Sequence, residues 1–142
     1  MIEATRTGNT MGAEVAGADL SQPLGEDAFR RLMALFLEHH VLVFRGQRLT
    51  APQFLAWASR FGPPEPHVLD QFHHPDYPDI LILSNVVKDG RPLGLADGGT
   101  YWHTDYSYLE IPARATTLYS IDVPKAGGDT LFADQMSAYD DL

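Results

Sequence analysis

The order of the expected elements predicts an α+β fold in which helices pack outside a β-barrel or β-sandwich. Two segments with helical periodicity, residues 26–40 and 50–61, lie in the first half of the 142-residue chain. The second half has short apolar segments separated by glycine- and proline-rich turns, which is typical of strands and their connections. Neither an internal repeat nor a low-complexity linker divides the sequence, so we expect one domain or part of one.

The amino-terminal third contains three expected elements. Residues 11–18 alternate small, acidic and apolar side chains, which predicts a short strand. Residues 26–40 predict an amphipathic helix, because their large apolar side chains recur at helical spacing. These side chains belong to Phe29, Leu32, Met33, Phe36 and Leu37. The apolar run Val41-Leu42-Val43-Phe44 then predicts a buried strand.

The middle of the chain begins with a helix start signal. Thr50-Ala51-Pro52-Gln53 has the pattern of a capping box with proline in the first turn, so we expect a second helix from there to about Phe61. Five prolines and three histidines between Gly62 and Pro78 predict a loop. Further strands are expected over residues 80–83, 115–123 and 129–133, with a glycine-rich connection over residues 87–99.

Composition narrows the possible classes of function. A net charge of −9 and only ten scattered basic residues argue against nucleic-acid binding through a basic face. The absence of cysteine excludes disulfides and thiolate metal sites, which leaves His, Asp and Glu as the strong metal ligands. No apolar run has membrane-spanning length and the first ten residues lack a signal peptide's apolar centre, so we expect a cytoplasmic protein without membrane contact.

His103 and Asp105 form the most informative pair of side chains. Both fall in a segment that reads as a strand, where side chains two residues apart point to the same side, within reach of one ion. An imidazole and a carboxylate are two of the three ligands in the 2-His-1-carboxylate triad that binds non-heme Fe(II). The same pattern also fits an ordinary strand histidine followed by a turn-forming aspartate, so the pair alone leaves both interpretations open.

Five blocks of sequence follow one another in a recognisable order. The two most specific are Trp102-His103-Thr104-Asp105 and Gly127-Gly128-Asp129-Thr130-Leu131-Phe132. The supporting blocks are Gly12-Ala13-Glu14-Val15-Ala16-Gly17-Ala18-Asp19-Leu20, His40-Val41-Leu42-Val43-Phe44-Arg45-Gly46-Gln47 and Phe61-Gly62. Together these blocks cover almost the whole chain and resemble the taurine dioxygenase family of Fe(II)- and 2-oxoglutarate-dependent oxygenases.

The resemblance implies a cupin-like double-stranded β-helix (jelly roll) with flanking helices and with iron at its mouth. His103 and Asp105 match the first two metal ligands, and Thr130 matches the threonine that contacts the distal carboxylate of 2-oxoglutarate. His67 and Asn85 match substrate-contacting positions more loosely, and a solvated loop histidine describes His67 equally well. The implied partners are a small organic acid, 2-oxoglutarate and dioxygen, while homo-oligomer formation is left open.

The resemblance also implies a second histidine ligand and a 2-oxoglutarate-binding arginine, both farther along the sequence than Leu142. We therefore expect residues 1–142 to be the amino-terminal part of a single dioxygenase domain, with an incomplete jelly roll. We expect this chain by itself to be inactive towards 2-oxoglutarate and prone to aggregate, because unpaired strand edges and an apolar inner face would be exposed.

Two other classes of function are considered, and the substrate is left open. A cupin-like binding or scaffold module would have no chemistry, because two ligands hold iron weakly. A zinc hydrolase is disfavoured because the chain has no HExxH or HxxEH helix. Sulfonates, aryloxy acids and acyl acids are the substrates implied by the resemblance. The acidic loop that contains Asp70, Asp76 and Asp79 departs from the taurine-type pattern, which puts taurine itself in doubt.

Overall fold

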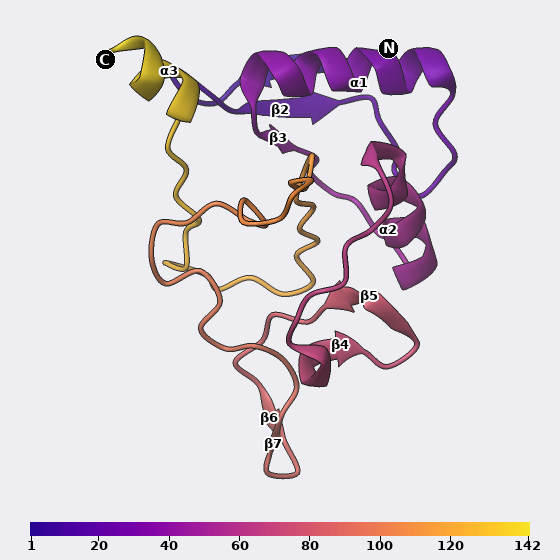
Figure 1. The fold of residues 1–142 in the computed structure, drawn as a ribbon. Helices are drawn as coiled ribbons and strands as arrows, with labels where there is room; N and C mark the ends of the chain where they lie inside the picture. Colours follow the sequence, from indigo (N-terminus) through magenta and orange to yellow (C-terminus); the bar gives the residue numbers. More distant parts are fainter. The chain divides into compact units, whose positions relative to one another are not determined.

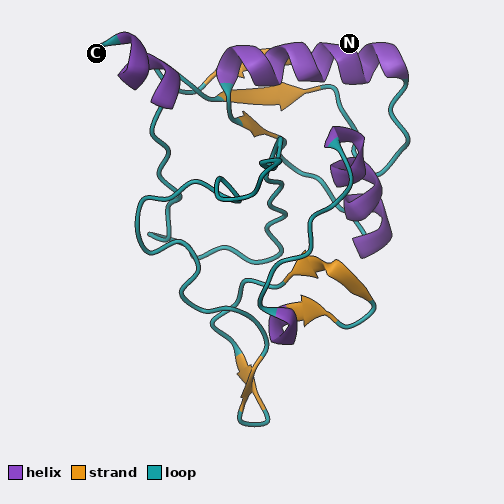
Figure 2. Ribbon diagram, viewed as in Figure 1, coloured by secondary structure: helices purple, strands orange, loops and turns teal.

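The computed structural model describes residues 1–142, which form two compact units (Figure 1). One unit contains Met1–Arg48 with Ser120–Leu142, and the other contains Leu49–Tyr119. Helices and short strands alternate with long loops (Figure 2), and the strands form one three-stranded and two two-stranded sheets. The α+β class is therefore confirmed, whereas a jelly roll is not seen. The longest helix has 14 residues, and no helix has the length and apolar character needed to cross a bilayer.

The sheet of the first unit is centred on strand β2 (Ala13–Ala16). Strand β1 (Glu3–Arg6) pairs with it antiparallel, and strand β3 (Leu42–Val43) pairs with it parallel. Helix α1 (Glu26–His39) connects β2 to β3, as parallel neighbours require. The strand and the helix expected within residues 11–40 are thus confirmed. The strand expected over residues 41–44 is shorter than predicted, and it is half-buried rather than buried.

The core of the first unit lies between α1 and β2, which run along each other in Figure 1. Leu32 and Leu35 are the most buried side chains of the helix, and their spacing of three residues puts them on one face. From the strand, Ala13 and Val15 are buried, as alternation along a strand predicts. Packing of one apolar helix face on one apolar sheet face therefore holds this unit together.

The end of α1 turns the chain back towards β2. His40 has a φ of 63° and its N–H donates to the carbonyl of Phe36 at 2.7 Å, which ends the helix. The carbonyl of His39 then accepts a hydrogen bond from the N–H of Gly12 at 2.8 Å, and the carbonyl of Val41 accepts one from Ala13 at 2.9 Å. These bonds set β3 in register beside β2.

Helix α3 (Gln135–Asp140) begins at an aspartate cap. Asp134 Oδ1 accepts hydrogen bonds from the N–H groups of Met136 at 3.0 Å and Ser137 at 3.4 Å. Its other oxygen accepts from the Ser137 hydroxyl at 2.6 Å, and His40 Nδ1 lies 3.5 Å from Oδ1. The Ser137 hydroxyl first, and then the two amides and His40, hold the pKa of Asp134 below its ordinary value.

The second unit starts with the helix that the capping box predicted. Helix α2 (Ala51–Ala58) is capped by Thr50, whose N–H donates to Gln53 Oε1 at 2.8 Å, and a 3₁₀ turn, η1 (Ser59–Phe61), follows it. Trp57 is the buried side chain of α2, and its ring meets that of Phe61 edge-on with centroids 5.2 Å apart. The helix expected over residues 50–61 is therefore confirmed.

Two hairpins of the second unit depart from the sequence-based expectation. Residues 62–78, expected as a loop, contain a 3₁₀ turn, η2 (Asp70–Phe72), and strand β4 (His73–His74). Strand β5 (Tyr77–Leu81) pairs with β4 antiparallel and begins three residues earlier than the strand expected over residues 80–83. Backbone pairing thus overrides the high proline content, because the prolines fall where no ladder hydrogen bond is needed.

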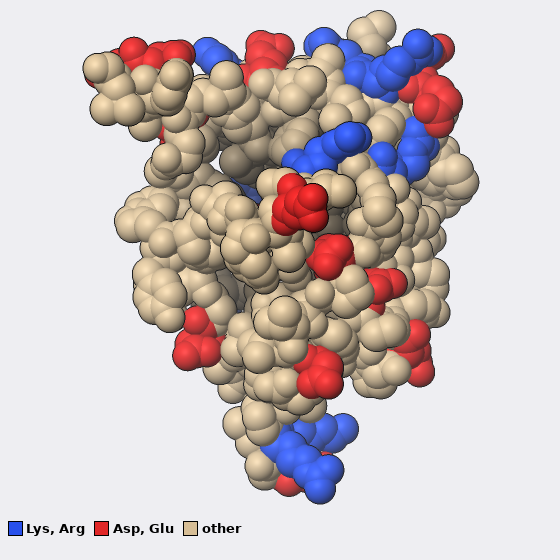
Figure 3. All heavy atoms as spheres, in the orientation of Figure 1, with Lys and Arg blue, Asp and Glu red and all other residues tan.

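The second hairpin lies in the connection expected over residues 87–99. Strands β6 (Val87–Lys88) and β7 (Arg91–Pro92) pair antiparallel across Asp89 and Gly90, whose φ values are 51° and 75°. An Asp-Gly pair with both φ values positive is a preferred two-residue hairpin turn, so the sequence did contain the signal. The hairpin contains Lys88 and Arg91, and in Figure 3 the blue atoms of Lys and Arg gather where Figure 1 shows it.

The strands expected over residues 115–123 and 129–133 do not form. Residues 115–119 nevertheless alternate in exposure, with Ala115, Thr117 and Tyr119 half-buried and the two residues between them exposed. Such alternation is the pattern of a strand, but a strand also needs a neighbour that pairs with its backbone groups. No paired strand lies beyond Pro92, so these segments stay irregular.

Replacing Leu32 with alanine is expected to destabilise the first unit by about 2–5 kcal/mol, because it leaves a cavity under a side chain that is only 1% exposed. The measurement is the free energy of unfolding in urea. Leu37→Ala is the matched control, since Leu37 lies on the same helix and is 71% exposed. Equal losses in the two variants would contradict the assigned core.

Asp134→Asn tests the charged cap of α3. Because the folded state lowers the pKa of Asp134, its stabilising effect is present above the pKa of the unfolded chain and is lost as pH falls through the folded pKa, below about pH 4. We expect faster amide exchange at Ser137 in the variant at pH 6, and a difference that shrinks as the pH is lowered towards 3. A difference that does not depend on pH would contradict the role of the carboxylate.

Candidate metal site

His103 and Asp105 converge, but no strand carries them. Residues 101–110 contain no strand: residues 102–104 are irregular, and a turn begins at Asp105, where Tyr106 follows with a φ of 53°. The strand predicted here is therefore wrong. The two side chains still lie on the same side, with His103 Nε2 3.2 Å from Asp105 Oδ1.

The imidazole of His103 is oriented by a backbone carbonyl. Its Nδ1 lies 2.7 Å from the carbonyl oxygen of Tyr101, and a carbonyl only accepts, so Nδ1 carries the proton in this bond. In a neutral ring, Nε2 then has only a lone pair, and this lone pair faces the carboxylate of Asp105. Two lone pairs at this distance need a positive centre between them, either a second ring proton or a metal cation.

The carboxylate of Asp105 is held on its other oxygen. Thr116 donates its hydroxyl to Oδ2 at 2.8 Å, which leaves Oδ1 as the oxygen that faces His103. The side chains of His103 and Asp105 are 50% and 40% exposed, so a small molecule can approach them. Sequence analysis missed Thr116, because it lies 11 residues after Asp105 in irregular chain where no spacing rule applies.

A glycine lies against the histidine. Gly99 has a φ of 82°, and a Cβ atom added to it would lie 3.4 Å from Cε1 of His103, the ring carbon between the two nitrogens. Any other residue at position 99 would be strained by this φ, although its Cβ would lie at ordinary van der Waals distance from the ring. The positive φ, rather than a lack of space, therefore favours glycine beside the imidazole.

His67 contacts Tyr106, the residue that follows Asp105. The two rings meet edge-on with centroids 6.3 Å apart, while His67 Nδ1 accepts the N–H of Leu69 at 3.1 Å. Burial first, and then the neighbouring Tyr108, Glu65 and Asp105, raise the pKa of Tyr106. His67 thus contacts the residue that directly follows the candidate ligand Asp105. These contacts give His67 no role in metal binding.

Asn85 and Thr130, the other residues singled out from sequence, both lie in irregular chain. Asn85 is exposed and forms no hydrogen bond with His103 or Asp105. Thr130 is exposed in the first unit, after Gly127 and Gly128, which both have a φ of 74°. No group of three or more His, Asp and Glu side chains lies together anywhere in residues 1–142, so the structure supplies two candidate ligands and no third.

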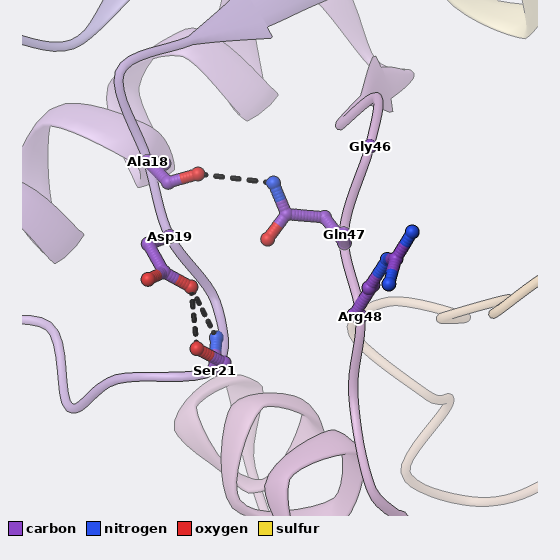
Figure 4. Close-up of a pocket in the computed structure, with 6 residues that line it drawn as sticks. All are labelled: Ala18, Asp19, Ser21, Gly46, Gln47 and Arg48. Atoms are coloured by element: carbon purple, nitrogen blue, oxygen red, sulfur yellow. Dashed lines mark hydrogen bonds between the residues drawn. The ribbon is translucent and has the colours of Figure 1, made fainter.

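A separate cavity of about 370 Å³ lies in the first unit (Figure 4). The side-chain amide of Gln47 donates to the carbonyl of Ala18 at 3.0 Å and accepts the N–H of Leu20 at 2.9 Å. Asp19 accepts both the N–H and the hydroxyl of Ser21, and these bonds lower the pKa of Asp19. Because these polar groups are engaged with one another, we assign this cavity no metal-binding role.

The donor set of His103 and Asp105 fits a divalent transition metal. A neutral imidazole nitrogen whose other nitrogen binds a carbonyl, next to a carboxylate oxygen, is an arrangement that protein metal sites use. Iron, zinc and manganese all accept this pair of donors, so geometry alone does not choose between them.

Known proteins resemble this chain along most of its length. It is 35% identical to pentalenolactone F synthase of Streptomyces arenae over 138 residues, which are 95% of this chain and 46% of that protein. It is 37% identical to the alpha-ketoglutarate-dependent 2,4-dichlorophenoxyacetate dioxygenase of Cupriavidus pinatubonensis over 141 residues, covering 92% of this chain and 49% of that one. The chain thus spans about half the length of the curated relatives it matches.

A solved structure and a family model agree with these relatives. The crystal structure of a taurine dioxygenase from Burkholderia xenovorans matches with a TM-score of 0.53 and 28% identity, over 61% of this chain and 31% of that one. The sequence model of the taurine catabolism dioxygenase TauD, TfdA family matches residues 3–142. Since that match extends over nearly every residue, this chain belongs to the TauD, TfdA family of dioxygenases.

Proposed function

We propose that this protein acts as an Fe(II)- and 2-oxoglutarate-dependent dioxygenase that hydroxylates a small organic acid. The observation that carries the proposal is the opposition of His103 Nε2 and Asp105 Oδ1 at 3.2 Å, with Nδ1 already bound to a carbonyl. A divalent cation bound by both atoms would satisfy both lone pairs. Family membership favours iron for that cation over zinc or manganese.

Each predicted residue has a role in this proposal. His103 and Asp105 bind iron, Thr130 donates its hydroxyl to the distal carboxylate of 2-oxoglutarate, and His67 and Asn85 contact the substrate. Iron and 2-oxoglutarate, when bound, supply the oxidation, in which one dioxygen converts a substrate C–H bond to C–OH and 2-oxoglutarate to succinate and carbon dioxide. Residues 1–142 contribute to the cupin-like jelly-roll domain where this takes place.

The substrate class that we favour is an aryloxy acid. The relatives that support this choice are dioxygenases named for 2,4-dichlorophenoxyacetate and for (S)-phenoxypropionate. The acidic loop that contains Asp70, Asp76 and Asp79 departs from the taurine-type pattern, which argues against taurine. The test is succinate release with aryloxy acids, acyl acids and taurine, each with Fe(II), ascorbate and 2-oxoglutarate. Turnover with taurine alone would contradict the choice.

The alternative is a binding or scaffold module without chemistry. The observation that favours it is that only two candidate ligands come together in residues 1–142. Titration with Fe(II) under anaerobic conditions separates the two proposals, with the protein expressed from its complete reading frame. An enzyme binds one iron per chain, whereas a module without chemistry shows no saturable binding.

Asp105→Ala is expected to reduce succinate production by a factor on the order of 100 or more, because a ligand is lost and the charge of the metal is less well balanced. The control is Asp122→Ala, which removes an exposed carboxylate that has no assigned role in the site. Succinate production and iron content are measured together. Wild-type turnover in Asp105→Ala would show that iron binds elsewhere.

Thr130→Ala is expected to raise the KM for 2-oxoglutarate about 10–100-fold, which corresponds to the loss of one hydrogen bond to a charged group. Iron affinity should remain close to that of the wild type, because Thr130 is not assigned as a ligand. Thr130→Ser is the matched control that keeps the hydroxyl. An unchanged KM in Thr130→Ala would remove Thr130 from the co-substrate site.

A further inference from the structure

We propose that Thr116 is a positioning residue for the metal ligand Asp105. The Thr116 hydroxyl donates to Asp105 Oδ2 at 2.8 Å, and Asp105 Oδ1 faces His103 Nε2 at 3.2 Å. Each carboxylate oxygen therefore has a different partner. This inference rests on the proposed function, because it assigns a role within the same metal site.

The hydrogen bond from Thr116 restricts how Asp105 can meet a cation. The terminal torsion of an aspartate has a broad, two-fold energy profile, so an unheld carboxylate rotates easily. A carboxylate can also offer one oxygen or both to a metal. With Oδ2 engaged by Thr116, only Oδ1 is directed towards His103, and a metal held there would keep its other coordination positions for small molecules.

Thr116 is placed by an anchor three residues later. The N–H of Leu49 donates to the hydroxyl oxygen of Tyr119 at 3.0 Å, and the Tyr119 ring lies 5.9 Å from that of Phe54 on helix α2. Tyr119 is half-buried, whereas Thr116 is exposed, as expected for residues an odd number apart in an extended segment. Because Tyr119 anchors one face of this segment, Thr116 lies on the opposite, exposed face.

Because Thr116 is exposed, its role in orienting Asp105 can be tested separately from any role in stabilising the fold. An exposed hydroxyl can bond to water instead, so the fold does not need the bond to Asp105. Loss of the hydroxyl should therefore leave the midpoint of urea unfolding unchanged and act on metal affinity. Thr117, its neighbour, is half-buried and forms no bond to Asp105, which makes it a suitable control position.

The experiment measures Mn(II) affinity by titration calorimetry on the protein expressed from its complete reading frame. The variant Thr116→Val removes the hydroxyl at constant shape, Thr116→Ser keeps it, and Thr117→Val is the control. We expect the Kd for Mn(II) to rise about 10–100-fold in Thr116→Val, the usual effect of losing a partner that orients a ligand. Thr116→Ser and Thr117→Val should bind Mn(II) like the wild type.

Asp105→Ala is titrated with Mn(II) in parallel, so that failure of the role of Thr116 can be distinguished from failure of the metal site itself. Loss of Mn(II) binding in Asp105→Ala together with wild-type binding in Thr116→Val overturns the role of Thr116 and leaves the metal site standing. Wild-type binding in Asp105→Ala overturns the metal site itself. Weakening in Thr116→Ser equal to that in Thr116→Val also overturns the role of the hydroxyl. If Thr116→Val does not fold, Thr116→Ala provides the same comparison without a β-branched side chain.

Discussion

The need of each backbone group for a hydrogen-bond partner decides which parts of this chain become regular structure. Strand β2 has a neighbour on both sides, because helix α1 ends in a turn that returns the chain parallel to it. The segments at residues 115–119 and 129–133 have suitable side chains and no paired neighbour, and they remain irregular. Order in residues 101–119 consequently comes from side-chain hydrogen bonds and ring contacts rather than from a ladder.

The candidate site illustrates how irregular chain can still be specific. His103 is oriented by the carbonyl two residues before it, and Asp105 by a hydroxyl that arrives from residue 116. Gly99, at a φ of 82°, lies beside the ring. Each contact is weak in exposed surroundings, but together they direct one nitrogen and one oxygen at the same point. Orientation of ligands by a second layer of partners is a general property of protein metal sites.

Sequence reasoning succeeded where the signal was local. The spacing of Leu32 and its neighbours identified α1, and the capping box at Thr50 identified α2, because both patterns involve contacts within one or two turns. The Asp89-Gly90 turn was equally local and was overlooked. The strand around His103 was wrong because strand formation depends on a distant partner. The pair His103–Asp105 converged nonetheless, whereas Thr116 could not be found, since its link to Asp105 exists only in the folded chain.

The bond between Leu49 and Tyr119 joins residues that are 70 positions apart and closes the second unit on itself. Lengthening a loop whose ends are fixed costs little free energy, because each doubling of its length adds only about 0.6 kcal/mol of closure entropy. Insertions or deletions in the proline-rich stretch near His67 would therefore leave the anchor at Tyr119 in place. The loops that surround His103 and Asp105 can thus change in length almost independently of these two candidate ligands.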